Sequence, residues 1–326
     1  MTREGHKADW SNYWQGRTAS DTGDALVGGV GIEHSSELTD FWSSVLGNVS
    51  VEAAILDLAC GAGSVLRHAH RLGLKNLSGI DISEDAIIAM QQAIPGAKGL
   101  VGPVDQMPVA DDQFDLVVSQ FGFEYAGNKK DLLQTASEIA RVLKKGGHLI
   151  AICHIKDGGI DREVSGHLIA IEELEATGFI LASKQLFDTL FAAEANPNEA
   201  TQAAFNIASE ALSQPRQALE TFIASNTGAD EQIRQLGQHL LAGAADLYAR
   251  RKAYALADIT GWLGGMQNEI DAYKGRMTSM KNAALDEAMC ASLLSVLEKS
   301  GYETEQPKPL HFGNEPDPAA WILKAG

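Results

Sequence analysis

Residues 55–63, with the sequence Ile-Leu-Asp-Leu-Ala-Cys-Gly-Ala-Gly, constrain the fold of this chain more than any other segment. The apolar residues are typical of a buried strand, and the two glycines allow a tight turn into a helix. A second apolar run, residues 77–81, also ends in an acid, Asp81. A strand, a glycine turn, a helix and a second strand with a terminal acid form the first half of a nucleotide-binding α/β unit. We therefore expect an adenosine-containing cofactor, because a carboxylate at the tip of the second strand can accept hydrogen bonds from two ribose hydroxyls.

The spacing within the glycine loop distinguishes between nucleotide cofactors. The dinucleotide fingerprint has a third small residue where this chain has Leu66, and the Gly-Lys-Ser/Thr sequence of a phosphate-binding loop is absent. The pattern Asp-x-x-x-Gly-x-Gly resembles instead that of the class I S-adenosylmethionine-dependent methyltransferases. Asp57 suits a ligand that carries an ammonium and a sulfonium, and it would repel a phosphate at short range. Ordinary strand–helix junctions also collect glycines, so the loop alone does not decide the matter.

Two further segments follow in the order that this resemblance implies. Residues 98–104 predict a short third strand, which ends at Asp105 and Gln106. Residues 107–121 are similar to the family's "LPF-x-D-x-x-FD-x-V" segment and lead into the fourth strand. The motifs occur together and in order, which supports the resemblance more than a lone glycine loop does.

The rest of the sheet is predicted from hydrophobic patterns. Apolar residues at helical spacing between 132 and 143 predict a helix that ends at Lys-Lys-Gly-Gly, residues 144–147. Residues 148–153 are almost continuously apolar, as expected for a fifth strand covered on both faces. Residues 302–305 and 320–325 predict two more strands near the carboxyl end. The resemblance implies an α/β fold with a doubly wound, mostly parallel seven-stranded sheet, in which the last two strands form an antiparallel pair at one edge.

Four segments describe the predicted organisation of the chain. We expect an aromatic and glycine-rich cap at 1–50, an S-adenosylmethionine-binding core at 51–156, a large helical insertion at 157–283, and a final helix with the antiparallel strand pair at 284–326. A structureless connection as long as the insertion would be implausible in a compact domain. We expect the insertion to serve as a substrate lid or in oligomerisation, for example in a homodimer.

The predicted amino-terminal cap contains Trp10, Tyr13 and Trp14, followed by several glycines between residues 23 and 31. Aromatic segments in this position would fold over the cofactor, with the glycines as a mobile connection. Alternatively, the helical spacing of the three aromatic residues indicates a small apolar cluster packed on the sheet.

Two apolar stripes mark the predicted helical insertion. One consists of Ile259, Trp262, Met266, Ile270, Tyr273, Met277 and Met280, and the other of Leu236, Leu240, Ala244, Leu247 and Tyr248. Spacings of three or four residues predict an antiparallel helix pair. The simplest interpretation of the stripes is a packed core. Methionine and aromatic side chains would also suit an irregular apolar ligand, and such a seam would suit a dimer interface.

Charge and cysteine content narrow the function classes. The 326 residues carry 43 acids against 26 bases, a formal net charge of -17, which disfavours a nucleic-acid substrate. Three cysteines without metal-ligand spacing predict neither a metal site nor a disulfide framework, and favour a reducing cytoplasm. A polar amino terminus and the absence of an eighteen-residue apolar run predict neither a signal peptide nor a membrane span.

The resemblance assigns cofactor-binding roles residue by residue. It places Asp57 near the methionine end of S-adenosylmethionine, with the glycine loop beneath it. It places Asp81 on the ribose, Ile82 beside the adenine, and an acid and an amide on the adenine edge. Gln120 would lie where the family makes backbone contacts to the amino-acid moiety. The predicted cofactor-binding residues are Asp57, Gly61, Gly63, Asp81, Ile82, Asp105, Gln106 and Gln120.

Candidate acceptor-side residues follow the fourth and fifth strands. His154 comes just after the fifth strand, where a base could reach a substrate hydroxyl. Glu124 and Tyr125 follow the fourth strand, together with Phe121 and Phe123. The alternative for His154 is a satisfied polar residue at a strand end, and the alternative for Glu124 is a surface acid.

The sequence thus predicts methyl transfer from S-adenosylmethionine to a small-molecule acceptor. Two alternatives stay open: a catalytically silent S-adenosylmethionine-binding module that docks a partner through its helical insertion, and a non-methyl reaction on the same fold. The residues quoted do not identify the acceptor or the atom that is methylated.

Overall fold

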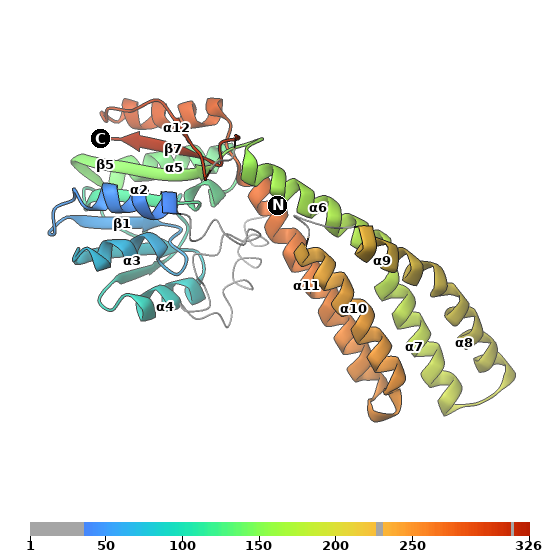
Figure 1. The fold of residues 1–326 in the computed structure, drawn as a ribbon. Helices are drawn as coiled ribbons and strands as arrows, with labels where there is room; N and C mark the ends of the chain where they lie inside the picture. Colours follow the sequence, from blue (N-terminus) through green and yellow to red (C-terminus); the bar gives the residue numbers. More distant parts are fainter. Residues whose placement is uncertain (1–35, 226–230, 314–315) are drawn as a thin grey trace. The chain divides into compact units, whose positions relative to one another are not determined.

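The computed structural model describes residues 36–225, 231–313 and 316–326, and the chain forms two compact units (Figure 1). The sheet unit comprises Met1–Val164 with Thr278–Gly326, and the helical unit comprises Ser165–Met277. Trp10, Tyr13, Trp14 and the glycines between residues 23 and 31 of the predicted cap lie outside the described residues.

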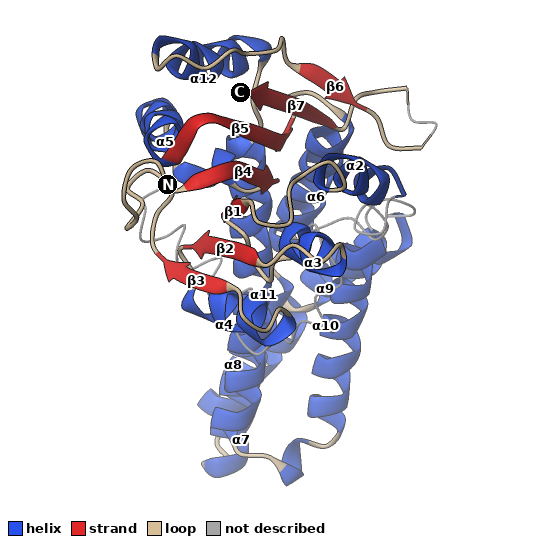
Figure 2. Cartoon of the chain, turned by 90° about the vertical axis from the view of Figure 1, so that its left-hand side faces the viewer, coloured by secondary structure: helices blue, strands red, loops and turns tan. Residues whose placement is uncertain are grey.

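A seven-stranded sheet forms the centre of the sheet unit, and its strands can be followed from β3 to β6 in Figure 2. The strand order is β3-β2-β1-β4-β5-β7-β6, with β7 antiparallel to both of its neighbours and the other pairs parallel. The predicted α/β fold class is therefore confirmed. The strands are β1 (Ala54–Leu58), β2 (Asn76–Asp81), β3 (Lys98–Val101), β4 (Phe114–Gln120), β5 (Leu143–His154), β6 (Lys308–Leu310) and β7 (Ala320–Ala325).

The strand order reverses at β1, which pairs with β2 on one side and with β4 on the other. Asp57 of β1 lies level with Gly79 of β2 and Val118 of β4. The carboxyl ends of parallel strands meet at one edge of a sheet, and ligands bind outside that edge where the order reverses. This topology places the ends of β1, β2, β4 and β5 in position to form one site.

The helices of the sheet unit bury one apolar face each. Residues of α5 and α12 share a continuous apolar core with β1, β4, β5 and β7. Local capping defines two helix starts, because Ser83 accepts a hydrogen bond from Ala86 N and Asn128 forms a reciprocal capping box with Asp131. The helices are α2 (Ser36–Leu46), α3 (Ser64–Arg71), α4 (Glu84–Ala93), the 3-10 turn η1 (Phe123–Ala126), α5 (Lys129–Val142) and α12 (Glu287–Lys299).

Three predictions about the bounds of helices and strands were wrong. The third strand stops at Val101, before the Gly-Pro pair that cannot continue the ladder. Residues 144–147 belong to β5 and do not end a helix, since pairing with β4 begins at Leu143 and is interrupted by a register shift. The edge strand is Lys308–Leu310, and residues 302–305 contribute only an isolated bridge from Thr304 to Ala325.

The helical unit has its own apolar core, to which its helices and partly buried aromatic residues contribute. Most of the predicted stripe on α11 is buried, including Ile259, Met266 and Ile270, so it serves as packed core. Gly243 of α10 lies against the Trp262 ring of α11, which shows that these two helices are in contact. The helices are α6 (Gly159–Ala176), α7 (Phe179–Ala195), α8 (Glu199–Ala211), α9 (Ser213–Ser225), α10 (Glu231–Ala249), the 3-10 turn η2 (Arg251–Ala253) and α11 (Leu256–Ala283). The first residues of α6 and the last residues of α11 belong to the sheet unit.

The chain leaves and re-enters the sheet unit through two paired segments. Leu285 N donates to His154 O at 2.8 Å, and Lys156 N donates to Leu285 O at 2.9 Å, which forms a parallel bridge. Nearby, Lys281 Nζ contacts the buried Asp161 carboxylate at 2.8 Å. We call these contacts the stem of the insertion. Within the described ranges, no helix is both long and apolar enough to cross a membrane.

Candidate functional site

The loop after β1 is held in an unusual backbone conformation. Ala59, Gly61 and Gly63 have φ angles of 48°, 51° and 79°, in the left-handed region that favours glycine. Cys60 N donates to Ile80 O at 3.0 Å, which ties the loop to the end of β2. The turn therefore depends on glycine at residues 61 and 63, as the sequence pattern indicated.

Gly63 in this loop and Gly79 in β2 allow close packing. A Cβ atom at Gly63 would lie 2.6 Å from Cγ of Met90, on α4. A Cβ atom at Gly79 would lie 2.6 Å from Sγ of Cys60. These contacts fix α4 and β2 against the loop, which gives Gly63 a structural role in addition to its φ angle.

Asp81 is the carboxylate that joins the loop to the second strand. It is buried, and its Oδ2 accepts from Gly61 N at 2.9 Å while its Oδ1 accepts from Ser83 N at 2.9 Å. Burial raises the pKa of Asp81 above its usual range, and the backbone donors act in the opposite direction. Each carboxylate oxygen has a further acceptor position, so the group can also receive ligand hydroxyls.

The other residues assigned to the cofactor lie at the same edge. Asp57 is buried within β1, and Ile82 is half-buried directly after Asp81. Asp105 is buried in the loop after β3, whereas Gln106 is exposed. The structure therefore brings the acids and the glycine loop to one edge and leaves the Gln106 side chain largely in solvent.

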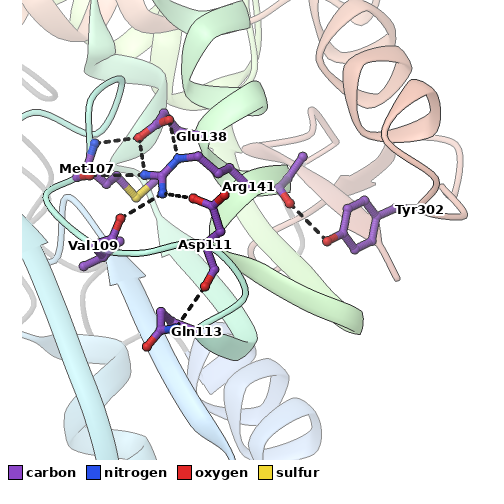
Figure 3. A network of polar contacts seen from close by, with 8 residues as sticks. Met107, Val109, Asp111, Gln113, Glu138, Arg141 and Tyr302 are labelled. Carbon is purple, nitrogen blue, oxygen red and sulfur yellow. Dashed lines mark hydrogen bonds and ion pairs between the residues drawn. The ribbon is translucent and has the colours of Figure 1, made fainter.

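An arginine holds the segment that follows Asp105 and Gln106 (Figure 3). Arg141 of α5 donates to the carbonyls of Met107 and Val109 at 3.2 and 2.8 Å, and to the carboxylates of Asp111 and Glu138. Glu138 in turn accepts from Met107 N at 2.7 Å. Arg141 lowers the pKa of Glu138, mainly through their hydrogen bond. This network explains why the acidic segment before β4 adopts a defined path.

Gln120, at the tip of β4, is engaged by a helix that the sequence analysis did not predict. Its Oε1 accepts from Nε1 of the fully buried Trp42 at 2.6 Å. Trp42 lies on α2, whose buried residues Leu38, Trp42 and Leu46 are four apart. That spacing is the sequence signal that would have predicted the helix.

The turn after β4 is anchored to the end of β1. Ser119 Oγ donates to Leu58 O at 2.9 Å and accepts from Phe123 N at 3.1 Å. A Cβ atom at Gly122 would lie 2.8 Å from Leu58 O, so only glycine allows this approach. Phe121 adopts a φ of 51°. Residues of η1 are therefore held beside the start of the glycine loop.

Glu124, in the turn η1 after β4, and His154, the last residue of β5, form a buried hydrogen-bonded pair. Glu124 Oε1 lies 2.8 Å from His154 Nδ1 and accepts from His154 N at 3.0 Å. Their side chains are 0% and 3% exposed. The rings of Phe121 and Tyr125 contact the imidazole, with centroids 4.5 and 5.7 Å away. The sequence analysis proposed Glu124 and His154 as separate candidates and did not predict the hydrogen bond between them.

The tyrosine and cysteine side chains near this pair have raised pKa values and therefore stay protonated and neutral. Burial, followed by the charge of Glu124, raises the pKa of Tyr125 well above its usual range. Burial likewise raises the pKa of Cys60 and Cys153, and raises that of Cys290 to about 12. Thiols that stay protonated are poor nucleophiles and poor metal ligands. The described part of the chain contains no cluster of metal-ligating side chains.

Comparison with known proteins gives a match over the region that carries this site. Residues 56–151 match a family model described as a methyltransferase domain. The demethylmenaquinone methyltransferase of Chlorobaculum parvum is 32% identical over 96 residues, which cover 29% of this chain and 39% of that protein. The ubiquinone/menaquinone biosynthesis C-methyltransferase of Campylobacter jejuni is 26% identical over 125 residues, covering 36% and 50%.

The similarity to solved structures is limited to part of the chain. A geranyl diphosphate C-methyltransferase from Streptomyces coelicolor, solved with S-adenosyl-L-homocysteine, has a TM-score of 0.37 and 19% identity, and covers 46% of this chain and 66% of that one. This chain spans half or less of the length of the two curated relatives described above. The matched region, together with the strand order and the acid–glycine loop, has the features of a class I S-adenosylmethionine-dependent methyltransferase domain, whose cofactor is S-adenosylmethionine.

Proposed function

We propose that this chain transfers the methyl group of S-adenosylmethionine to a small-molecule acceptor at the carboxyl edge of the sheet. The observation that carries the proposal is the position of Asp81, whose carboxylate is fixed by the amides of Gly61 and Ser83. A carboxylate held in this way presents free acceptor positions where a ribose would bind. The sulfonium of the cofactor supplies an activated methyl carbon, so catalysis depends mainly on positioning and on exclusion of water.

The residues at this edge fit S-adenosylmethionine better than a phosphate-bearing cofactor. Asp57 and Asp81 are both buried carboxylates, and they would attract the cationic methionine end and accept ribose hydroxyls respectively. Ile82 would lie against the adenine, with Asp105 and Gln106 at its polar edge. Gln120 would contact the amino-acid moiety through its backbone, since its side chain is bound to Trp42.

A small-molecule acceptor is supported by charge and by the relatives. The net charge of -17 opposes binding of nucleic acid. Two curated relatives carry names that refer to quinone methylation, although they match only part of this chain. We propose that the helical unit contributes acceptor selection or self-association.

Two measurements test this proposal. Calorimetry with S-adenosylhomocysteine measures cofactor binding, and incubation with methyl-labelled S-adenosylmethionine and a metabolite extract measures turnover. We expect binding and a labelled small molecule. Binding without any labelled product would favour a silent module, and absence of binding would contradict the assigned cofactor site.

A further inference from the structure

Two buried polar atoms at the ends of β4 and β5 have no hydrogen-bond partner among the described residues. They are Glu124 Oε2 and His154 Nε2, the outer atoms of the hydrogen-bonded pair. Buried polar side-chain atoms are nearly always bonded, so each exception requires an explanation. The packing of the fold does not supply one, because the inner atoms, Glu124 Oε1 and His154 Nδ1, already hold the two residues together.

The hydrogen bonds of the pair favour one position for the hydrogen on the imidazole ring. Glu124 Oε1 receives two groups of His154, the backbone N–H at 3.0 Å and Nδ1 at 2.8 Å. With Glu124 as a carboxylate, which can only accept, and with a neutral ring, Nδ1 is the donor and Nε2 carries the lone pair. Both unpartnered atoms, Oε2 and Nε2, are then hydrogen-bond acceptors. The missing partner is a donor, such as a hydroxyl.

The pair lies beside the proposed cofactor edge. Ser119 Oγ donates to the carbonyl of Leu58, the last residue of β1, and Gly122 packs closely against the same carbonyl, so the turn that carries Glu124 is held there. His154 is the last residue of β5, the strand next to β4. Both residues therefore belong to the edge at which the glycine loop begins.

Four side chains near the pair are aromatic or uncharged. Phe121 and Tyr125 contact the imidazole ring, and the thiols of Cys153 and Cys290 lie near enough to Glu124 for its charge to affect them. These surroundings suit a flat, uncharged molecule that carries a hydroxyl.

We propose that His154 Nε2 is the general base for a hydroxyaryl acceptor, a phenol or hydroquinone, and that Glu124 is its positioning residue. This inference rests on the proposed function and adds the class of acceptor to it. A base is needed only when the acceptor atom must lose a proton to become nucleophilic, as a phenol must and a neutral amine need not before attack.

The proposed step balances in atoms and charge. The hydroxyl proton passes to His154 Nε2, and the electron pair of the resulting oxyanion, or of the ring carbon it activates, forms the new bond to the methyl carbon. The carbon–sulfur bond breaks and its electrons remain on sulfur. The positive charge of the sulfonium is replaced by that of the imidazolium, which the Glu124 carboxylate stabilises. After methylation at carbon, the ring loses the proton on that carbon to solvent and regains its aromatic character.

The first test needs neither cofactor nor acceptor. The ¹⁵N shifts of the His154 ring, assigned by comparison with His154→Asn, report which nitrogen carries the hydrogen in the neutral protein. We expect hydrogen on Nδ1 and a bare Nε2. In Glu124→Gln we expect a mixture of tautomers, because the amide no longer demands a donor. Hydrogen on Nε2 in the unmodified protein would overturn the proposal.

The second test measures methyl transfer to defined probes. A naphthohydroquinone and a catechol are the hydroxyaryl probes, and benzylamine and benzyl mercaptan are the matched non-hydroxyl probes. We expect label from S-adenosylmethionine in a hydroxyaryl probe. Label only in the amine or thiol, or in none of the probes, would overturn the assigned acceptor class.

Variants separate a base from a merely structural histidine. Asparagine can retain a donor near the Nδ1 position but has no atom at Nε2, so His154→Asn preserves the contact to Glu124. We expect kcat for the labelled probe to fall about 100- to 10,000-fold. Binding of S-adenosylhomocysteine should not change. The same substitution at exposed His148, on the same strand, should leave kcat unchanged. Full activity in His154→Asn would contradict the role of the base.

Glu124→Gln should lower kcat and shift the pH–rate profile, because the imidazolium loses its counter-charge. An unchanged profile would overturn the positioning role. Failure of the unmodified protein to bind S-adenosylhomocysteine would contradict the proposed function itself. Retained binding with a wrong tautomer or an active His154→Asn would contradict only this inference.

Discussion

The cofactor side and the acceptor side of the candidate site are built in different ways. The cofactor side is made largely of backbone, with three left-handed residues between 59 and 63 and a carboxylate held by amide groups. The proposed acceptor side is made of two side chains, Glu124 and His154, which lie 30 residues apart in the chain. A backbone site is sensitive to any added Cβ atom, whereas a side-chain pair is sensitive to the identity of each partner. The acceptor side can therefore change by substitution while the cofactor side remains fixed.

Removal of one partner of the acceptor-side pair should have the largest effect on stability. Glu124→Leu leaves the buried His154 Nδ1 and backbone N–H without their acceptor, and we expect a loss of about 3–5 kcal/mol in the free energy of unfolding. Urea denaturation measures this value. Adding His154→Leu should restore part of the loss, because it removes one orphaned donor. Strict additivity of the two substitutions would show that they are not coupled.

A matched pair of glycine substitutions tests the cofactor side. Gly63→Ala introduces both backbone strain and an overlap with Met90, and we expect it to lower the free energy of unfolding by about 3 kcal/mol. Gly73→Ala has a similar φ of 86° but no atom within 4 Å of the new Cβ, so it should cost only about 1–2 kcal/mol. Equal losses in thermal or urea denaturation would show that packing against α4 contributes nothing.

Asp81→Asn should weaken binding of S-adenosylhomocysteine by about 1–3 kcal/mol, because a charge-assisted hydrogen bond to the ribose is lost. Calorimetry measures the change, with Asp85→Asn, at an exposed residue in the first turn of α4, as control. Unchanged affinity in Asp81→Asn would contradict the ribose assignment.

The same variant has a predicted pH signature. Burial raises the folded pKa of Asp81 above its ordinary value of 3.8. Its stabilising contribution is then fully present below 3.8 and is lost as the pH rises through the folded pKa. We therefore expect the stability of the unmodified protein relative to Asp81→Asn to decrease as the pH increases across that window. A difference that grows with pH would have the wrong sign.

Arg141→Met should have a smaller effect, about 1–2 kcal/mol, because the guanidinium is partly exposed to solvent. Since Arg141 lowers the pKa of Glu138, its contribution is present above the ordinary value of 4.5 and is lost as the pH falls through the folded pKa. Urea denaturation as a function of pH tests both statements. Lys144→Met, which removes a more exposed ion pair with Asp115, should cost less than about 1 kcal/mol. A larger loss for Lys144→Met would reverse the expected order.

The same contrast explains how much of the molecule could be predicted from its sequence. The acid–glycine loop and Asp81 are local features, since glycine at a left-handed position and an acid at a strand end leave a direct pattern in the sequence. The seven-stranded sheet followed from apolar runs and from the family resemblance. Such features can be predicted because they depend on residues that are close in the sequence, or on a strand order that is common to the family.

Contacts between distant residues were not predictable in the same way. The bond from Trp42 to Gln120 joins residues 78 apart, and no local pattern relates them. The predicted start of the fifth strand was wrong because pairing with β4 extends β5 through Gly146 and Gly147, two residues whose type favours the end of a helix. The pairing of Glu124 with His154 likewise depends on the parallel register of β4 and β5.

The stem of the insertion has a consequence for how such proteins diversify. The bridge between Ile155 and Leu285 and the contact between Asp161 and Lys281 close the chain at the base of the helices. For the folding of the sheet, residues Ser165 to Met277 then act as one long loop whose two ends are joined by the stem. The entropic cost of closing a loop grows only slowly with its length. Evolution could lengthen, shorten or exchange this module while the strand register beneath it stays intact. Leu285 N also binds the backbone carbonyl of His154, so the stem of the insertion adjoins the residue that we propose as the base.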